Sequence, residues 1–249
     1  MTRNRPVPVV TPENREFVRS LMIYEDDDLI AFNKPSGLPV QDGRGIDRSL
    51  DSLLDAFARS NGKRPRLVHR LDAGTSGIVV VAKTQPAAAF LSGEFAERQT
   101  RKTYVAIVGS NPPAEKSGLI DVPLVKVQET GRSRMIAARA DRKGALASRT
   151  RWDLLETRGA CAIMRLYPES GHQIRIHLAH IGCPIIGDPI YGHGVRDGCR
   201  LMLHALSLEI RKPSGGLLEL TADIPSDFAE VVNELGFESL SSAAWSGSM

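Results

Sequence analysis

The sequence predicts an α+β fold in which helices flank a mixed, largely antiparallel sheet. Short apolar runs of strand length recur along most of the chain, separated by Pro and Gly, and only a few windows show helical spacing. The 249 residues are 42% hydrophobic and 24% charged, which is typical of a globular protein and excludes a disordered chain, a coiled coil and a collagen-like repeat.

The first half of the chain alternates strands with two helices. We expect strands at residues 21–24, 29–33, 66–68 and 78–82. The acidic residues 25–28 form the turn of a hairpin between the first two strands. Apolar side chains recur at helical spacing from Leu50 to Phe57, and Thr84 can cap a second helix that has Pro86 in its first turn.

The second half of the chain is richer in strands. We expect them at residues 103–108, 119–124, 133–138, 148–155, 161–166, 201–210 and 217–222. Residues 172–180 have a helical pattern that ends before Gly182 and Pro184, and a short helix follows Pro225. Strands interrupted by so few helices favour α+β over a regular alternation of strand and helix.

No repeat or low-complexity linker divides the chain. We therefore expect one domain at residues 21–235, an N-terminal extension at 1–20 and a C-terminal tail at 236–249. No apolar stretch approaches the roughly 18 residues of a membrane span, and no apolar secretory segment begins the chain. The three cysteines are scattered and odd in number, which favours reduced thiols. The sequence predicts a cytoplasmic protein with no membrane partner, and we expect a monomer.

Basic residues are concentrated in one segment. Of the 32 basic residues 24 are Arg, the side chain best suited to bidentate contact with phosphate. Residues 132–151 hold seven basic residues and one acid, whereas no Lys or Arg follows Lys212. This asymmetry predicts a side that faces a polyanion, although the same charges could simply keep the strands soluble. The candidate RNA-backbone residues are Arg132, Arg134, Arg142 and Arg149.

Several common catalytic motifs are absent. The chain has no GxxxxGK[ST] phosphate loop and no complete glycine fingerprint for a dinucleotide. Residues 74–77, GTSG, are one residue too short for the serine-hydrolase motif GxSxG. His172, His177 and His180 do not share one helical face, and no CxxC supports a metal site. We expect His172, His177 and His204 to be buried hydrogen-bonding groups.

A polar turn, HRLDAGTSG at residues 69–77, stands between two apolar strands. Turns on a rigid base commonly carry catalytic groups. Asp72 lies at its centre and Arg70 two residues earlier, while Thr75 and Ser76 can hydrogen-bond the backbone and hold the turn. Spacing alone leaves open a surface turn whose Asp caps its own backbone.

Five segments resemble, in order, the signature of the RluA-type family of pseudouridine synthases. They are NKPSGL at 33–38, HRLDAGTSG at 69–77, KTYVA at 102–106, HQIRIHL at 172–178 with GD and YG at 187–192, and LMLHALSL at 201–208. The resemblance covers about residues 21–228. It implies the family's catalytic core with a central cleft, here without a separate RNA-binding module.

The resemblance also implies a role for individual residues. Asp72 corresponds to the catalytic aspartate, Tyr104 to the tyrosine that packs on the flipped uracil, and Arg175 to the arginine that pairs with the aspartate. Arg70 corresponds to the arginine that helps to displace the target base. The expected substrate-binding residues are Arg70, Lys34, Thr75, Ser76 and His172, with Lys34 on the RNA backbone. No cofactor or metal is implied.

The implied reaction breaks the bond between uracil and ribose and rejoins the base through its carbon five. Because the departing base returns as the nucleophile, one carboxylate suffices where glycoside hydrolysis needs two. Asp72 would attack the sugar or remove a ribose proton. The alternatives are an N-glycosidase that releases uracil and a non-catalytic RNA-binding or ribosome-associated protein. The missing second carboxylate argues against the first, and the presence of Asp72, Tyr104 and Arg175 argues against the second.

The implied substrate is a uridine that is extruded from structured RNA. Core-only members of the family act on the tRNA anticodon stem-loop, on a large-subunit rRNA hairpin, or on both, and we expect a compact stem-loop of this kind. One segment departs from the family. Where TGR followed by Ser or Thr usually precedes HQ, this chain has Pro168, Glu169, Ser170 and Gly171, so an acid replaces a basic contact.

Overall fold

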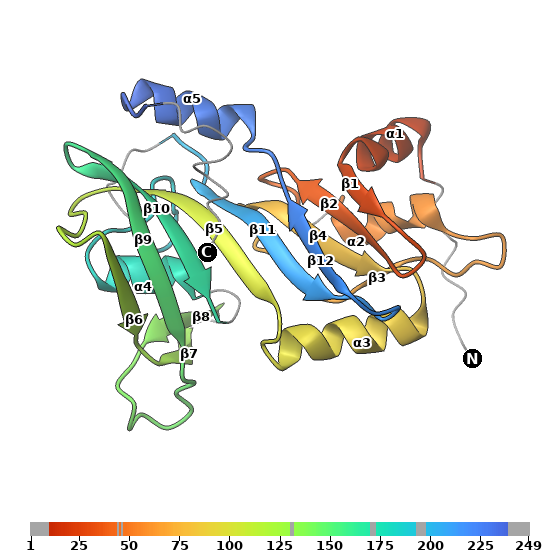
Figure 1. Cartoon of the computed structure of the whole chain (residues 1–249), viewed down its shortest axis with the longest axis horizontal. Helices are drawn as coiled ribbons and strands as arrows, with labels where there is room; N and C mark the ends of the chain where they lie inside the picture. Colours follow the sequence, from red (N-terminus) through yellow and green to blue (C-terminus); the bar gives the residue numbers. More distant parts are fainter. Residues whose placement is uncertain are drawn as a thin grey trace.

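A large sheet organises the computed structural model, which describes residues 10–43, 45, 47–129, 132–169, 173–192 and 198–238 (Figure 1). The strands are β1 (Met22–Glu25), β2 (Leu29–Lys34), β3 (Arg66–Leu67), β4 (Ser76–Ala82), β5 (Arg101–Val108), β6 (Ser117–Asp121), β7 (Leu124–Glu129), β8 (Arg132–Ala137), β9 (Arg149–Arg158), β10 (Cys161–Pro168), β11 (Leu203–Arg211) and β12 (Leu217–Thr221). The helices are α1 (Pro12–Ser20), α2 (Leu50–Leu53), α3 (Gln85–Ala96), α4 (Ile174–His180) and α5 (Ser226–Glu234), with a 3-10 turn η1 at Leu54–Phe57.

Ten of the strands form one sheet in the described part of the chain. Its main path is β1-β2-β4-β11-β5-β10-β9-β6, with β12 paired to β11 and β3 paired to β4. Only β4 and β11 run parallel; the other paired strands of the sheet are antiparallel. This confirms the predicted α+β fold with a mixed, largely antiparallel sheet.

The parallel junction between β4 and β11 depends on Gly77. Its φ is +109°, and a Cβ at this position would lie 2.2 Å from the carbonyl oxygen of Ala205. No other residue allows so close an approach of the two strands. The polar turn of residues 69–77 therefore enters the sheet at a fixed place, in the middle of the strand order.

Two apolar clusters meet beside this turn. One lies around β5, β10, α4 and α5, and the other lies around β2, β4, α1 and α2. Tyr104 of β5 packs against both clusters. The side chain of Tyr104 thus stands at the boundary between these two clusters.

Local signals located most elements correctly. Asp26 closes the predicted hairpin turn, since its Oδ1 accepts from the backbone N–H of Asp28 and Leu29, both at 2.9 Å. Thr84 caps α3 as predicted by accepting from the backbone N–H of Ala87 at 3.2 Å. The prediction of an N-terminal extension at 1–20 did not foresee α1, which packs on the core through the fully buried Val18.

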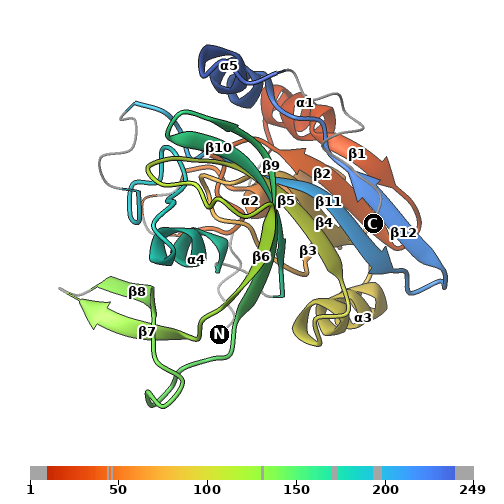
Figure 2. The same cartoon turned by 60° about the vertical axis from the view of Figure 1, so that its left-hand side comes forward.

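The single strand predicted at 119–124 is wrong. The chain leaves the large sheet after β6, and β7 begins a separate two-stranded sheet with β8 (Figure 2). Pro123 lies at the break and has no N–H for a sheet hydrogen bond. Figure 2 shows β7 and β8 standing apart from the large sheet, below α4.

No helix in the described ranges is both long and apolar enough to cross a membrane. All three cysteines are free thiols. Most of the predicted tail at 236–249 lies outside the described residues, and the domain boundaries stay predictions.

Candidate active site

Asp72 and Arg175 meet although 103 residues separate them. The guanidinium Nη1 of Arg175, on α4, donates to Oδ2 of Asp72 at 3.0 Å. The turn that carries Asp72 is closed by the backbone N–H of Thr75, which donates to the Asp72 carbonyl oxygen at 3.1 Å. This contact confirms the implied pairing of the two side chains. It holds the Asp72 carboxylate just before the first residue of β4.

Asp188 anchors the other side of Arg175. Its two oxygens accept from Nε and Nη2 of Arg175 at 2.8 and 2.6 Å, and its side chain is 1% exposed. Burial would raise the pKa of Asp188, but Arg175 and the backbone N–H groups of Tyr191 and Ile190 hold it below its ordinary value. Burial likewise opposes the charge of Arg175, while both carboxylates raise its pKa. Arg175 is therefore a fixed cation between two carboxylates.

Tyr191 completes the support of Arg175. The Arg175 guanidinium lies 5.2 Å from the centre of the Tyr191 ring, and the Tyr191 hydroxyl donates to the Met135 carbonyl oxygen on β8 at 2.9 Å. Asp188 and Tyr191 belong to the GD and YG matches at 187–192, but the sequence analysis predicted no role for either residue. The active site is thereby linked to the separate β7–β8 sheet.

Lys34 corrects one prediction. Its side chain is fully buried, and its Nζ donates to the carbonyl oxygens of Pro35, Leu38 and Ala73 at 2.9, 2.9 and 3.1 Å. Burial lowers its pKa to about 7, and the Asp72 charge opposes that shift. We expected Lys34 to contact the RNA backbone, and this expectation is wrong. The ammonium group is enclosed by these carbonyl oxygens inside the protein. It holds the residue that follows Asp72.

The neighbours of Lys34 hold the same turn. The backbone N–H of Gly37 donates to the Ala73 carbonyl oxygen at 2.8 Å, and the hydroxyl of Ser36 donates to that of Gly74 at 2.7 Å. The NKPSGL segment is therefore a clamp on the two peptide groups after Asp72. Such a clamp fixes the direction of the carboxylate before any substrate arrives.

Thr75 and Ser76 also lie inside the protein. Thr75 is 3% exposed and Ser76 is fully buried, with its hydroxyl 2.9 Å from Nδ1 of His204. The expectation that these two side chains contact substrate is corrected because both are buried, and the Ser76 hydroxyl instead joins β4 to His204 of β11. His172, also expected at the substrate, lies outside the described residues.

Tyr104 and Arg70 are two further predicted site residues that keep some exposure. Tyr104 is half-buried, and burial together with the Asp72 charge raises the pKa of its phenol, so the hydroxyl is neutral at neutral pH. Arg70 is exposed, and its Nη1 donates to Oε1 of Gln41 at 3.3 Å. The arrangement joins a fixed carboxylate, an aromatic ring and an exposed cation.

His177 and His204 are buried hydrogen-bonding groups, as expected. The ring nitrogens of His177 lie 2.8 Å from the Thr150 hydroxyl and 2.9 Å from the Val122 carbonyl oxygen. Burial lowers the pKa of His204 to about 4. Within the described ranges, no three His, Cys, Asp or Glu side chains are grouped so that they could hold a metal ion.

The four arginines predicted to contact RNA lie on or near the β7–β8 sheet and β9. Arg134 and Arg142 are exposed, and Arg149 pairs with Asp121 at 2.9 Å. Arg132 belongs to β8, but its side chain is outside the described part.

Glu169, the acid that departs from the family pattern, accepts from Nη1 of Arg98 at 3.2 Å. Arg98 follows α3 with a φ of +58°, a left-handed conformation that non-glycine residues rarely adopt. A cation from a distant segment thus neutralises the acid at this position.

Comparison with known proteins agrees with this geometry. A sequence model of the family described as RNA pseudouridylate synthase matches residues 28–180. An uncharacterised RNA pseudouridine synthase of Zymomonas mobilis is 35% identical over 84% of this chain and 96% of that protein. The ribosomal large subunit pseudouridine synthase D of Pasteurella multocida is 35% identical over 86% of this chain and 70% of that protein.

A solved structure points the same way. Human RNA pseudouridylate synthase domain containing 4 aligns with a TM-score of 0.75 and 26% identity, covering 90% of this chain and 97% of that one. The match to the family extends over more than half of the chain and includes Asp72, Tyr104 and Arg175. The chain therefore belongs to the RNA pseudouridylate synthase family.

Proposed function

We propose that the protein isomerises uridine to pseudouridine in a compact RNA stem-loop through the single carboxylate of Asp72. The observation that carries the proposal is the ion pair of Asp72 with Arg175, which is itself held by the buried Asp188. The pair keeps Asp72 ionised and aimed at one place. An ionised carboxylate is the group that the reaction requires.

The reaction rearranges one nucleotide without a net change of atoms. The bond from uracil N1 to the sugar C1′ breaks, the bond from uracil C5 to C1′ forms, the proton on C5 passes to solvent and N1 gains a proton from solvent. Asp72 begins this sequence either by attack on the sugar or by removal of a ribose proton. No water is consumed, so one carboxylate suffices.

Two other residues act on the base. Arg70 is exposed beside the turn and would occupy the space that the extruded uridine leaves. Tyr104 offers its ring face to the uracil, and its neutral hydroxyl is a hydrogen-bond donor rather than a base. The half-buried position of Tyr104 between the two core clusters keeps this ring in place.

The proposed substrate is a stem-loop of the tRNA anticodon type, a large-subunit rRNA hairpin, or both. Loop bases are already partly unstacked, which lowers the extrusion cost of a few kcal/mol. The name of the Pasteurella multocida relative refers to the large ribosomal subunit, which supports the rRNA part of the proposal.

The test offers the purified protein three RNAs labelled with tritium at uridine C5: an anticodon stem-loop, an rRNA hairpin and an unstructured strand. We expect tritium release from at least one stem-loop and little from the strand. Equal turnover of the strand would contradict recognition of a stem-loop. Free uracil in the product would instead identify an N-glycosidase, and binding without tritium release would identify a non-catalytic RNA-binding protein.

A further inference from the structure

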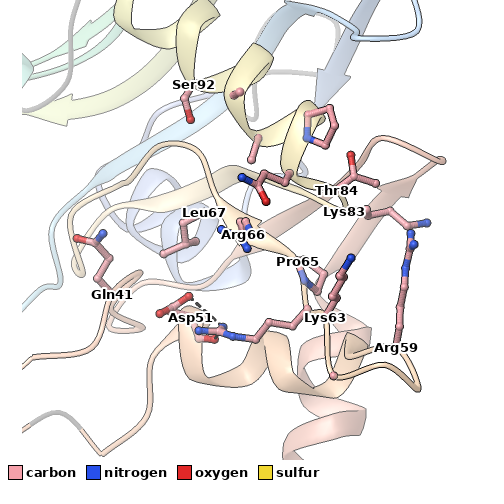
Figure 3. A pocket seen from close by; sticks show the side chains of 16 residues that line it. Gln41, Asp51, Arg59, Lys63, Pro65, Arg66, Leu67, Lys83, Thr84 and Ser92 are labelled. Atoms are coloured by element: carbon pink, nitrogen blue, oxygen red, sulfur yellow. Dashed lines mark hydrogen bonds and ion pairs between the residues drawn. The ribbon is translucent and has the colours of Figure 1, made fainter. Parts of the chain in front are cut away.

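We propose that a basic hollow between η1, β3 and α3 binds the phosphate backbone of RNA beside the target uridine. The hollow has a volume of about 1190 Å³ and is lined by the loop after η1, by β3 and by the start of α3 (Figure 3). This inference rests on the RNA substrate of the proposed function. It adds a second RNA-binding surface on the side of the molecule away from the β7–β8 sheet (Figure 1).

The charge of the hollow is strongly positive. Its charged lining residues are Arg59, Lys63, Arg64, Arg66, Lys83 and one acid, Asp51. A smaller neighbouring hollow of about 520 Å³ shares Arg59, Lys63 and Lys83 and adds Arg15 and Arg19 of α1. The two hollows form one basic band, and such a concentration of positive charge attracts a polyanion.

Two of these cations are already engaged within the protein. Arg64 pairs with Asp51 at 3.1 Å and with Asp55 at 3.2 Å, and Lys83 pairs with Glu25 at 2.8 Å. These ion pairs fix the walls of the hollow and use the acids that line or border it. They leave the remaining cations without a carboxylate to neutralise them.

Arg59, Lys63 and Arg66 are the remaining cations of the larger hollow. All three are exposed, and none forms an ion pair with any residue in the described ranges. Figure 3 shows Arg59 and Lys63 on the side of the hollow opposite Gln41. Three exposed, uncompensated cations along one concave surface are the arrangement that binds successive phosphates.

The lining also indicates which part of the RNA would bind. None of the 16 side chains drawn along the hollow is aromatic, so bases find no ring to stack on. Arg and Lys side chains that bind phosphate position a nucleic acid without reading its sequence. The hollow therefore fits the backbone rather than a flipped base.

A hydrogen bond links the lining of the hollow to the turn that carries Asp72. Gln41 lines the hollow and accepts a hydrogen bond from Arg70, which lies two residues before Asp72. Strand β3 leads from the hollow along the chain into the same turn. An RNA whose uridine enters at Asp72 would thus extend past Arg70 into the hollow.

The first test uses the unmodified protein and lysine acetylation read by mass spectrometry. Lys63 and Lys116 are both exposed, and Lys116 precedes β6 in the other half of the molecule. We expect a stem-loop RNA to reduce labelling of Lys63 several-fold and to leave Lys116 unchanged. Equal labelling of Lys63 with and without RNA would overturn the proposal. Equal protection by inorganic phosphate alone would overturn it too, because the hollow would then be a general anion site.

The second test compares two double variants that each remove one Arg and one Lys. Arg59→Gln with Lys63→Gln should make the slope of log affinity against log salt shallower by about 1.4 to 1.8. This value assumes that two phosphate contacts are lost, at roughly 0.7 to 0.9 each. The matched control, Lys116→Gln with Arg158→Gln, removes exposed charges in the other half and should keep the original slope.

An unchanged slope in the first variant, with an intact thermal melt, would overturn the proposal. Filter binding reports this slope whether or not the RNA reacts. Failure of isomerisation would therefore show in tritium release alone, and failure of the hollow would show in the slope.

Discussion

The catalytic turn and the basic surfaces on either side of it are built in opposite ways. At the turn, Arg175 is largely enclosed, Lys34 is fully buried, and each has several partners: Arg175 bridges Asp72 and Asp188, and Lys34 donates to three carbonyl oxygens. On the surfaces, Arg59 and Arg142 are exposed and form no ion pair with a described residue.

The difference fits the function that we propose for each region. Bond rearrangement needs a carboxylate held within a fraction of an ångström, whereas phosphate binding needs only positive potential near a flexible chain. Changes at the turn should therefore reduce stability and turnover, and changes on the surfaces should alter affinity and its salt dependence.

The largest expected effect is on stability, from Lys34→Met. The variant keeps the size of the side chain but removes three buried hydrogen bonds, so we expect a decrease of about 4 kcal/mol in the free energy of unfolding. Urea denaturation measures this decrease. Lys126→Met, at an exposed position on β7, is the control and should change stability by less than about 0.5 kcal/mol. A decrease below about 1 kcal/mol for Lys34→Met would remove the contrast between the two regions.

The second effect is a decrease of stability in acid through His204. Its folded-state pKa, about 4, lies below the ordinary value of 6.5, so the unfolded chain binds the extra proton between these values. The stability contribution is present above pH 6.5 and disappears as the pH falls to about 4. At about 1.4 kcal/mol per pH unit this decrease is about 3 kcal/mol.

Unfolding free energies between pH 7 and 4 test this effect. His204→Gln should lower the slope of the curve by about 1.4 kcal/mol per pH unit, while His69, whose pKa burial lowers to about 3, keeps its own contribution. His180→Gln, at an exposed position, should leave the curve as it was. A wild-type slope retained by His204→Gln would contradict the assignment of this histidine.

The third effect is on turnover, from Asp188→Asn. The isosteric amide cannot hold Arg175 in a bidentate ion pair, so Asp72 loses its fixed direction and kcat should fall about 100-fold. RNA affinity should change only a few-fold. The control Asp141→Asn removes an exposed carboxylate and should retain kcat. If kcat for Asp188→Asn stayed within threefold of wild type, Asp188 would have no positioning role.

The smallest effect is expected on RNA affinity, from the arginines on and near the β7–β8 sheet. Neutralising Arg132, Arg134 and Arg142 to Gln should weaken RNA binding and lower its salt slope by roughly 0.7 to 0.9 for each phosphate that the variant no longer binds. Filter binding between low and high salt measures this. An unchanged slope would mean that these arginines face solvent, and the hollow at Arg59 and Lys63 would then be the main grip on the RNA.

The sequence predicted most of the fold because the decisive signals were local. The cap of Thr84 and the turn at 25–28 need no knowledge of distant residues. Thr11 with Pro12 is an equally local helix start that was overlooked, and it begins α1. The sequence does not reveal that the chain changes sheets at Pro123. The apolar residues on both sides of Pro123 favour one continuous strand, although proline lacks the N–H for a sheet hydrogen bond.

The site was less predictable because its chemistry depends on tertiary structure. The family resemblance located Asp72 and Arg175, and their ion pair follows the expectation. The sequence predicts an RNA contact for Lys34, whereas the fold brings three carbonyl oxygens around its ammonium group. Lysine is seldom buried, so its position could not be read from its type. The role of Asp188 likewise exists only once α4 turns Arg175 toward it.

Our proposal that the Asp72 carboxylate carries the bond rearrangement while other groups supply the RNA affinity has one direct test. Asp72→Asn is compared with the unmodified protein for tritium release from C5-labelled uridine in a stem-loop, and for filter binding to the same RNA. We predict that isomerisation is abolished while affinity stays within a few-fold, since phosphate contacts supply most of the binding. Retained turnover in the variant would contradict the account.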